Sequence, residues 1–154
     1  MSLLDDWIAC AGSWRGVSTL QDPELGIGEE SPSTVKVTPV LVGRFVRLDY
    51  TWSYRGQPQE GSLLIGFEKG EETITAHWID TWHMSDKVMA CRGPRPDGPT
   101  LALLGSYPAP PGADWGWRIE LTVEPEGTLR LVMYNLWPEG GREDLAVEAT
   151  YTRT

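Results

Sequence analysis

Asp80 is the residue of this chain whose surroundings are most suggestive of chemistry. It follows Ile74, Ala76 and Trp78 at every second position, so in an extended strand its carboxylate shares their face. A buried carboxylate is unfavourable unless a hydrogen bond or an opposite charge compensates it. Arg92 on the following strand is a candidate partner, and a Tyr hydroxyl is another. Asp80 is therefore either a functional group in a cavity or a structural carboxylate near the mouth of the fold.

Aromatic side chains recur at alternating positions around Asp80 and on other extended segments. Apolar walls with a few polar groups are typical of small-molecule sites. The candidate ligand-binding residues are Trp52, Tyr54, Trp78, Asp80, Trp82, Arg92, Trp117 and Asn135. Tyr50, Met133 and Trp137 are expected on the same inner surface. The alternative is that these rings only fill the core.

Two histidines close to Asp80 raise the question of a metal site. On one strand His77 and His83 share a face but lie about 20 Å apart, and Asp80 is on the opposite face. We therefore expect no metal and no cofactor, with His77 on the solvated outer face. The chain has no Gly-x-Ser-x-Gly motif and no phosphate-binding glycine loop, so no catalytic residue is assigned. An enzyme that uses Asp80 with a Tyr or an Arg remains the alternative.

Short β-strands are the elements that must position these residues. Residues 44–55 alternate most plainly, with Tyr50 and Trp52 on one face and charged or hydroxyl side chains on the other. Ten such segments joined by turns predict an antiparallel meander that closes into an up-and-down barrel, because closure removes exposed edges. The expected strands are residues 13–20, 34–41, 44–55, 60–68, 73–82, 87–93, 100–107, 115–123, 129–137 and 145–153. We expect residues 21–32 to form a loop over the open end.

Residues 1–11 predict the one helix of an otherwise all-β chain. Its apolar face consists of Leu3, Leu4, Trp7, Ile8 and Ala11. Gly12 ends the pattern, and a helix this short needs an apolar surface to rest on. We expect it to plug one end of the barrel. A single domain over residues 1–154, with the barrel over 13–153, follows from this arrangement.

Composition restricts the possible partners and location. The net charge of -9 disfavours nucleic acids and anionic membrane surfaces, so neither partner is expected. No apolar run approaches the roughly 20 residues needed to span a bilayer. Asp5 and Asp6 near the start argue against a signal peptide, which predicts a cytoplasmic protein. Cys10 and Cys91 form no Cys-x-x-Cys pair and are expected to be buried and reduced.

Four short motifs carry a family resemblance over nearly the whole chain. They are Gly12-Ser13-Trp14, Leu64-Ile65-Gly66-Phe67, Trp78-Ile79-Asp80-Thr81 and Glu148-Ala149-Thr150-Tyr151-Thr152-Arg153. In this order the chain resembles the calycins, the superfamily of lipocalins and fatty-acid-binding proteins. More narrowly it resembles the bacterial, lipocalin-like domain-of-unknown-function family 1579. That family usually has an Asp after the fourth-strand aromatic, whereas Glu68 follows in this chain. The family has no established activity to transfer.

The calycin resemblance implies that Trp14 is covered by Arg153 at the closed end of the barrel. A Trp side chain buries roughly 150–250 Å², which is on the order of 4–6 kcal/mol as an upper estimate. A guanidinium stacked on the indole adds roughly 0.5–2 kcal/mol. We assign both residues a structural role.

The sequence thus predicts a lipocalin-like barrel that binds a small hydrophobic or aromatic molecule, neutral or cationic rather than anionic. Haem bound through a histidine, as in some other lipocalin-like barrels, is a further alternative. A homodimer is left open beside a monomer.

Overall fold

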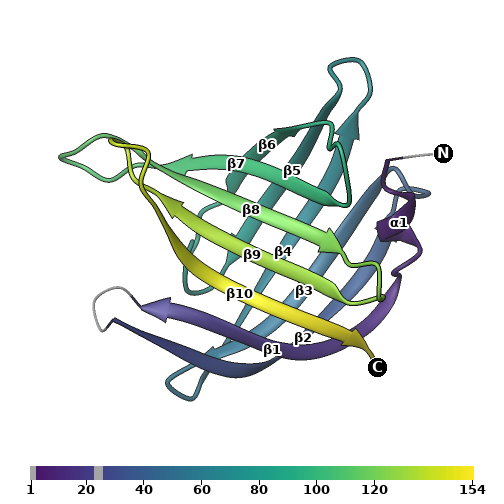
Figure 1. The fold of residues 1–154 in the computed structure, drawn as a ribbon, viewed down its shortest axis with the longest axis horizontal. Helices are drawn as coiled ribbons and strands as arrows, with labels where there is room; N and C mark the ends of the chain where they lie inside the picture. Colours follow the sequence, from purple (N-terminus) through teal and green to yellow (C-terminus); the bar gives the residue numbers. More distant parts are fainter. Residues whose placement is uncertain (1–2, 23–25) are drawn as a thin grey trace.

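Ten antiparallel strands form a closed barrel in the computed structural model, which describes residues 3–22 and 26–154 (Figure 1). The strands are β1 (Gly12–Asp22), β2 (Ile27–Val40), β3 (Phe45–Tyr54), β4 (Gln57–Glu68), β5 (Thr73–Asp80), β6 (Met89–Pro94), β7 (Thr100–Tyr107), β8 (Trp115–Val123), β9 (Leu129–Leu136) and β10 (Glu143–Arg153). Each strand pairs with its neighbours in sequence, and β1 pairs with β10 to close the barrel. The expected all-β, up-and-down barrel of ten strands is confirmed, and it is consistent with a lipocalin-like fold.

Alternation along the strands places one set of side chains inside the barrel. On β3, Val46, Leu48, Tyr50 and Trp52 are buried, whereas the residues between them are partly or fully exposed. The same pattern runs along the middle of β8. Each inward side chain meets those of facing strands, so the strands share one core inside the closed sheet.

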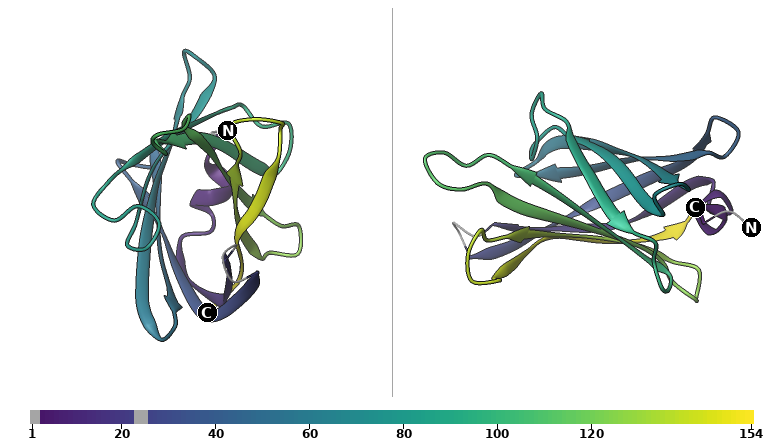
Figure 2. Two further views of the ribbon diagram at one scale, coloured as in Figure 1. Left: turned by 90° about the vertical axis from the view of Figure 1, so that its left-hand side faces the viewer. Right: turned by 90° about the horizontal axis from the view of Figure 1, so that it is seen from above.

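The helix α1 (Asp5–Ile8) closes one end of the barrel. It is shorter than the predicted residues 1–11, of which 1 and 2 lie outside the described residues. Leu4 and Trp7 are 1% and 3% exposed, so this segment buries its apolar side chains against the barrel. Figure 2 looks through the barrel from the opposite end in its left view, with α1 at the far side. No described helix is long and apolar enough to cross a bilayer.

Trp14 and Arg153 meet beside this helix. They are direct partners in the β1–β10 ladder, and the Arg153 guanidinium lies 4.6 Å from the centre of the indole ring. The guanidinium donates to the carbonyl of Ala11 at 2.9 Å and to that of Ala9 at 3.1 Å. The Trp14 indole N–H donates to the carbonyl of Cys10 at 2.8 Å. The carbonyls that end the helix are therefore bonded by side chains from the first and last strands.

Two expected segments differ from the structure. The predicted loop over residues 21–32 is wrong, because β1 extends to Asp22 and β2 begins at Ile27. Residues 23–25 lie outside the described residues. The predicted strand over residues 73–82 ends at Asp80, and the chain turns there. The second difference decides the geometry of the candidate site.

Two apolar side chains lie at the rim of the barrel, although the sequence predicts one of them, Trp137, on its inner surface. A register shift between Leu145 and Val147 on β10 leaves Leu145 37% exposed, because a bulge reverses the facing of residues beyond it. Trp137 follows the end of β9 and is also 37% exposed. Its ring lies 4.7 Å from that of Trp115, and the Arg142 guanidinium lies 4.2 Å from its centre.

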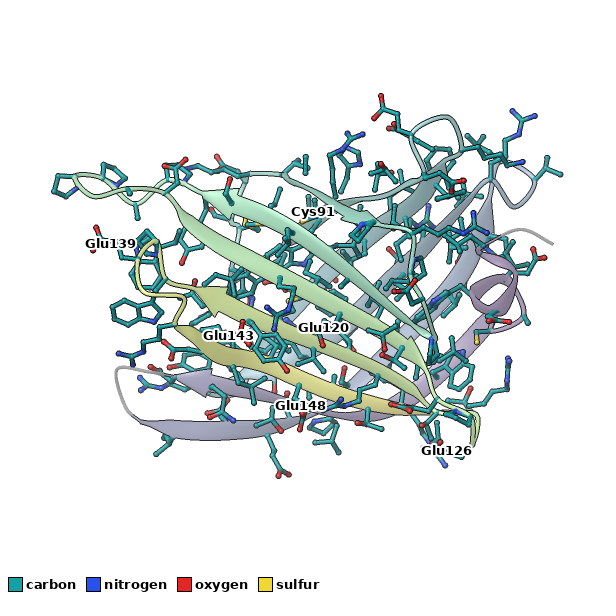
Figure 3. All side chains as sticks on the ribbon, turned by 45° about the horizontal axis from the view of Figure 1, so that its top comes forward. Cys91, Glu120, Glu126, Glu139, Glu143 and Glu148 are labelled. Carbon is teal, nitrogen blue, oxygen red and sulfur yellow. The ribbon has the colours of Figure 1, made fainter. Side chains whose placement is uncertain are left out.

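The outer face of β8–β10 carries a network of ion pairs, whose glutamates Figure 3 labels. Arg118 contacts Glu120 and Glu143 at 2.7 Å each, and Arg130 contacts Glu148 at 2.6 Å. The hydrogen bond from Arg118 lowers the pKa of Glu143. Glu143 therefore remains a fixed negative charge at the rim of the barrel.

Candidate functional site

Asp80 is buried at the end of β5 and accepts hydrogen bonds on both carboxylate oxygens. It is 3% exposed. Its Oδ2 accepts from the Tyr50 hydroxyl at 2.6 Å. Its Oδ1 accepts from the backbone N–H groups of Trp82 at 2.9 Å and His83 at 2.8 Å. The carboxylate thus ties down the turn that follows it, as an Asp at the start of a turn commonly does.

Arg92 is not the partner of Asp80, and the predicted pairing is wrong. Arg92 lies opposite Thr75 in the β5–β6 ladder, and its side chain is 56% exposed on the outer surface. It contacts Glu68 at 3.1 Å and Glu71 at 3.5 Å. The alternation of β6 turns its neighbours inward and Arg92 outward, so it does not line the interior.

His83 is the residue that the sequence-based prediction missed. A strand that extends to Trp82 would place His83 on the outer face, but the turn after Asp80 brings its ring back to the carboxylate. The His83 Nδ1 atom lies 3.2 Å from Asp80 Oδ1, and the imidazole is only 10% exposed. The signal in the sequence is Asp80 itself, because an Asp that ends a strand often accepts from the N–H groups two and three residues later. His77, by contrast, is exposed on β5.

Tyr50 reaches Asp80 across a glycine. Gly61 on β4 lies between them in the sheet, opposite Tyr50 on one side and opposite Asp80 on the other. A Cβ atom at Gly61 would lie 2.3 Å from the Tyr50 hydroxyl, so only glycine leaves room for this side chain. The Trp78 indole N–H donates to the same hydroxyl at 2.8 Å. A hydrogen-bonded chain therefore runs from Trp78 through Tyr50 to Asp80.

The pKa values of Tyr50 and Asp80 diverge in this network. Burial raises the pKa of Tyr50, and the neighbouring carboxylate raises it further, so the phenol stays protonated. Burial alone would raise the pKa of Asp80 as well. The hydrogen bonds from His83, the charge that its ring carries when protonated, and the Tyr50 hydrogen bond outweigh burial and lower the pKa of Asp80 below its ordinary value. Asp80 is therefore ionised at neutral pH and acts as an acceptor.

Four tryptophans surround the His83 ring, and we call these five side chains the mouth cluster. Its members are Trp52, Trp78, Trp82, His83 and Trp117. The ring centres of the tryptophans lie 4.7–5.6 Å from that of the imidazole. Trp78 and Trp117 are stacked on each other, 5.3 Å apart with 13° between their planes. Strands β3, β5 and β8 and the turn after β5 each contribute to the cluster.

The barrel is hollow on the mouth side of this cluster and filled on the other. A larger mouth pocket of about 680 Å³ lies between the cluster and the ends of β1, β9 and β10. A smaller mouth pocket of about 470 Å³ lies between the cluster, residues 84–89 and the end of β7. Trp82, His83 and Trp117 line both pockets. Below the cluster, two spaces measure about 10 Å³ each, scarcely enough for one water molecule.

The remaining predicted residues lie around the larger mouth pocket. The Tyr54 hydroxyl donates to Asp22 at 2.7 Å, and the Tyr54 ring lies 5.3 Å from Trp82. Asn135 lines the pocket from β9 and accepts a hydrogen bond from Tyr107 at 2.6 Å. Tyr107 is a second residue that the prediction missed. The structure thus brings the predicted aromatic residues and Asp80 together, with Asn135 across the pocket and Arg92 outside.

Residues 3–22 and 26–154 contain no group of three or more His, Cys, Asp or Glu side chains placed to hold a metal ion. Both cysteines are buried and unpaired. Burial raises the pKa of Cys10, and it raises that of Cys91 to about 11, so both remain thiols at neutral pH.

Comparison with known proteins agrees with the barrel. The crystal structure of Rv2717c from M. tuberculosis superimposes with a TM-score of 0.66 at 14% sequence identity, and the match covers 100% of this chain and 98% of that chain. At this identity the likeness shows the fold alone. A search among curated proteins finds no match. The family model described as "Protein of unknown function (DUF1579)" matches residues 7–153, and the chain therefore belongs to this family.

Proposed function

We propose that the protein binds a small hydrophobic or aromatic molecule in the mouth of the barrel. The observation that carries this proposal is the buried indole N–H of Trp117, which has no hydrogen-bond partner among the described residues although its ring lines both mouth pockets. A buried donor without a partner costs roughly 1–3 kcal/mol, and a ligand atom that accepts from it removes this cost.

The shape and lining of the mouth support the same proposal. Pockets of about 680 and 470 Å³ fall within the size range of small-molecule sites. Trp82, His83 and Trp117 form the aromatic wall that the two pockets share, and polar or charged side chains lie around it. Asp22, Glu143 and Asp144 line the larger pocket with a single guanidinium, that of Arg142, so the rim favours neutral or cationic molecules.

Titration with 1-aminoanthracene, a neutral fluorescent aromatic, tests this proposal. We expect saturable binding to the wild type. Ala146→Trp places an indole at the larger mouth pocket and is expected to weaken binding by about tenfold or more. Ala90→Trp is the matched control, because Ala90 is exposed on β6 and lines neither mouth pocket. Absence of saturable binding, or equal binding by both variants, would contradict the proposal. Native mass spectrometry and an absorption spectrum of fresh protein would reveal a co-purified ligand, haem included.

A second candidate function is acid–base catalysis on a molecule held in the same pocket. The contact between Asp80 and His83 favours it, because a carboxylate that orients an imidazole is a recurrent arrangement in catalysis. Asp80→Asn that retains binding but loses turnover of a bound molecule would support an enzyme. Unchanged turnover in that variant would exclude a role for Asp80 in the reaction.

A further inference from the structure

The buried donor of Trp117 has a complementary acceptor beside it. Trp117 is 6% exposed, and its indole N–H is one of two buried side-chain polar atoms without a partner among the described residues. Buried indole N–H groups usually find an acceptor. The ring centre of Trp117 lies 5.4 Å from that of His83, and both side chains line both mouth pockets.

His83 presents an acceptor because of the way Asp80 holds it. The Asp80 carboxylate is ionised and can only accept, so the His83 Nδ1 atom carries the proton of this contact. In a neutral imidazole the other nitrogen, Nε2, then has a free lone pair. No described residue makes a hydrogen bond to Nε2. Trp117 and His83 therefore carry one buried, unpartnered donor and one acceptor on neighbouring rings that line both mouth pockets.

A hydroxyl group of a ligand can satisfy both atoms at once, because it donates one hydrogen bond and accepts others. The walls on either side are aromatic: Trp78 stacks on Trp117, and Trp82 meets His83 edge to face at 4.7 Å. A flat ring attached to the hydroxyl suits such walls. The carboxylates at the rim disfavour an anion in the same place.

We propose that the mouth of the barrel selects neutral, hydroxylated aromatic molecules, with the hydroxyl accepting from Trp117 Nε1 and donating to His83 Nε2. This inference rests on the proposed function and specifies the class of its ligand. The bound hydroxyl would supply the partner that Trp117 lacks.

Equilibrium dialysis with four naphthalene derivatives tests the proposal near neutral pH. The four compounds are 2-naphthol, 2-methoxynaphthalene, naphthalene and 2-naphthoate. The methoxy compound keeps the acceptor but has no donor for His83, and 2-naphthoate adds a negative charge. We expect 2-naphthol to bind at least about tenfold more tightly than naphthalene, which makes neither hydrogen bond, and about fivefold more tightly than 2-methoxynaphthalene, which lacks one of them. We expect 2-naphthoate to bind more weakly than 2-naphthol because of its charge.

Two variants test whether Trp117 and His83 cause the preference for 2-naphthol. Trp117→Phe removes the N–H and keeps an aromatic ring, and His83→Phe removes the acceptor. In each, we expect the advantage of 2-naphthol over naphthalene to fall by about fivefold or more, while naphthalene affinity changes less. Trp115→Phe is the matched control on the same strand, because Trp115 packs against Trp137 at the rim and lines neither mouth pocket. It should keep the full preference.

The outcomes separate this inference from the proposed function. If 2-naphthol, 2-methoxynaphthalene and naphthalene bind the wild type equally, the mouth binds aromatic molecules but does not select a hydroxyl, and the inference is overturned. If Trp117→Phe retains the full preference for 2-naphthol, the inference is overturned as well. If none of the four compounds binds and 1-aminoanthracene fails too, both the inference and the proposed function are wrong.

Discussion

The two ends of the barrel are built from the same alternating strands but have opposite interiors. At the closed end, Trp14 is covered by Arg153, and Trp7 seals the core from the helix segment. The space beside Trp7 measures about 10 Å³. At the mouth, side chains of the same type surround pockets of several hundred Å³.

The difference lies in what happens to the polar atoms of the aromatic residues. At the closed end the Trp14 indole N–H donates to a backbone carbonyl just after the helix. The side chain of the first strand and the end of the helix thus satisfy each other's hydrogen-bonding groups. At the mouth, Trp78 is bonded through Tyr50, but the N–H of Trp117 is left without a partner among the described residues. Tryptophan side chains thus form packed core at the closed end, whereas at the mouth one indole N–H has no hydrogen-bond partner among the described residues.

Truncation of a closed-end tryptophan is expected to have the largest effect. Trp14→Ala removes a side chain that is 3% exposed, and we expect it to lower the free energy of unfolding by about 3–5 kcal/mol. Trp82→Ala makes the same change at the mouth, where the side chain is 41% exposed, and should cost less than half as much. Urea denaturation of both variants measures the difference. Equal losses would remove the distinction between the two ends.

Gly61→Ala tests whether the Tyr50–Asp80 hydrogen bond needs the space that the missing side chain of Gly61 leaves. The new Cβ atom would lie 2.3 Å from the Tyr50 hydroxyl and 2.9 Å from the backbone oxygen of Ile79, so one of them must move. We expect a loss of about 1–3 kcal/mol in the free energy of unfolding. Gly70→Ala is the matched control, because a Cβ atom there has no heavy atom within 4 Å. A fully stable Gly61→Ala variant would show that the Tyr50–Asp80 contact is not constrained by this glycine.

Asp80→Asn is expected to destabilise the protein by about 1–2 kcal/mol at neutral pH, through weaker hydrogen bonds to the mouth network. Because the folded pKa of Asp80 is lowered, its charged form stabilises the fold above the unfolded pKa of about 3.9. That contribution is lost as the pH falls through the folded value. The difference between wild type and variant should therefore be full at pH 5–7 and shrink below about pH 4.

Urea titrations at several pH values check this dependence. Asp86→Asn removes an exposed carboxylate from the same turn and should change the free energy of unfolding by less than about 0.5 kcal/mol. A difference between wild type and Asp80→Asn that grows toward low pH would contradict a lowered pKa of Asp80 in the folded protein.

Arg153→Ala should have the smallest effect of the four. The guanidinium is exposed, so its contact with the Trp14 ring and its bonds to two carbonyls are expected to contribute about 0.5–1 kcal/mol. Arg153→Lys, which keeps the charge but not the planar fork, should fall between wild type and Arg153→Ala. Thermal denaturation of the three proteins gives the order. A loss as large as that of Trp14→Ala would mean that Arg153 holds the helix rather than covering the ring.

The alternation of apolar and polar residues predicts whether a residue in a strand lies on the inner or the outer face of the barrel. Tyr50, Trp52, Trp78 and Trp117 point inward as expected, because period two assigns each to the inner face whatever its partner. The partner of Asp80 is not predictable in this way. It depends on where β5 ends, and a turn that begins two residues early moves His83 from the outer surface to the centre of the mouth cluster.

Strand register explains the positions of Arg92 and Leu145. Pairing Arg92 with Asp80 requires a particular turn between the two strands, whereas the ladder sets Arg92 opposite Thr75 and faces it outward. In a regular strand Leu145 would share the face of Val147, and a bulge in β10 turns it outward. Both positions depend on pairing between strands, which a single sequence leaves open.

Indole N–H resonances in a ¹H–¹⁵N correlation spectrum test most directly the claim that only the mouth end accepts a ligand. The chain has eight tryptophans, distributed over both ends and the rim, and Trp→Phe variants assign their signals. On addition of 2-naphthol, the account predicts shifts for Trp78, Trp82 and Trp117, the largest at Trp117, and unchanged signals for Trp7 and Trp14. Shifts confined to Trp7 and Trp14, or no shift at any tryptophan at saturating ligand, would contradict it.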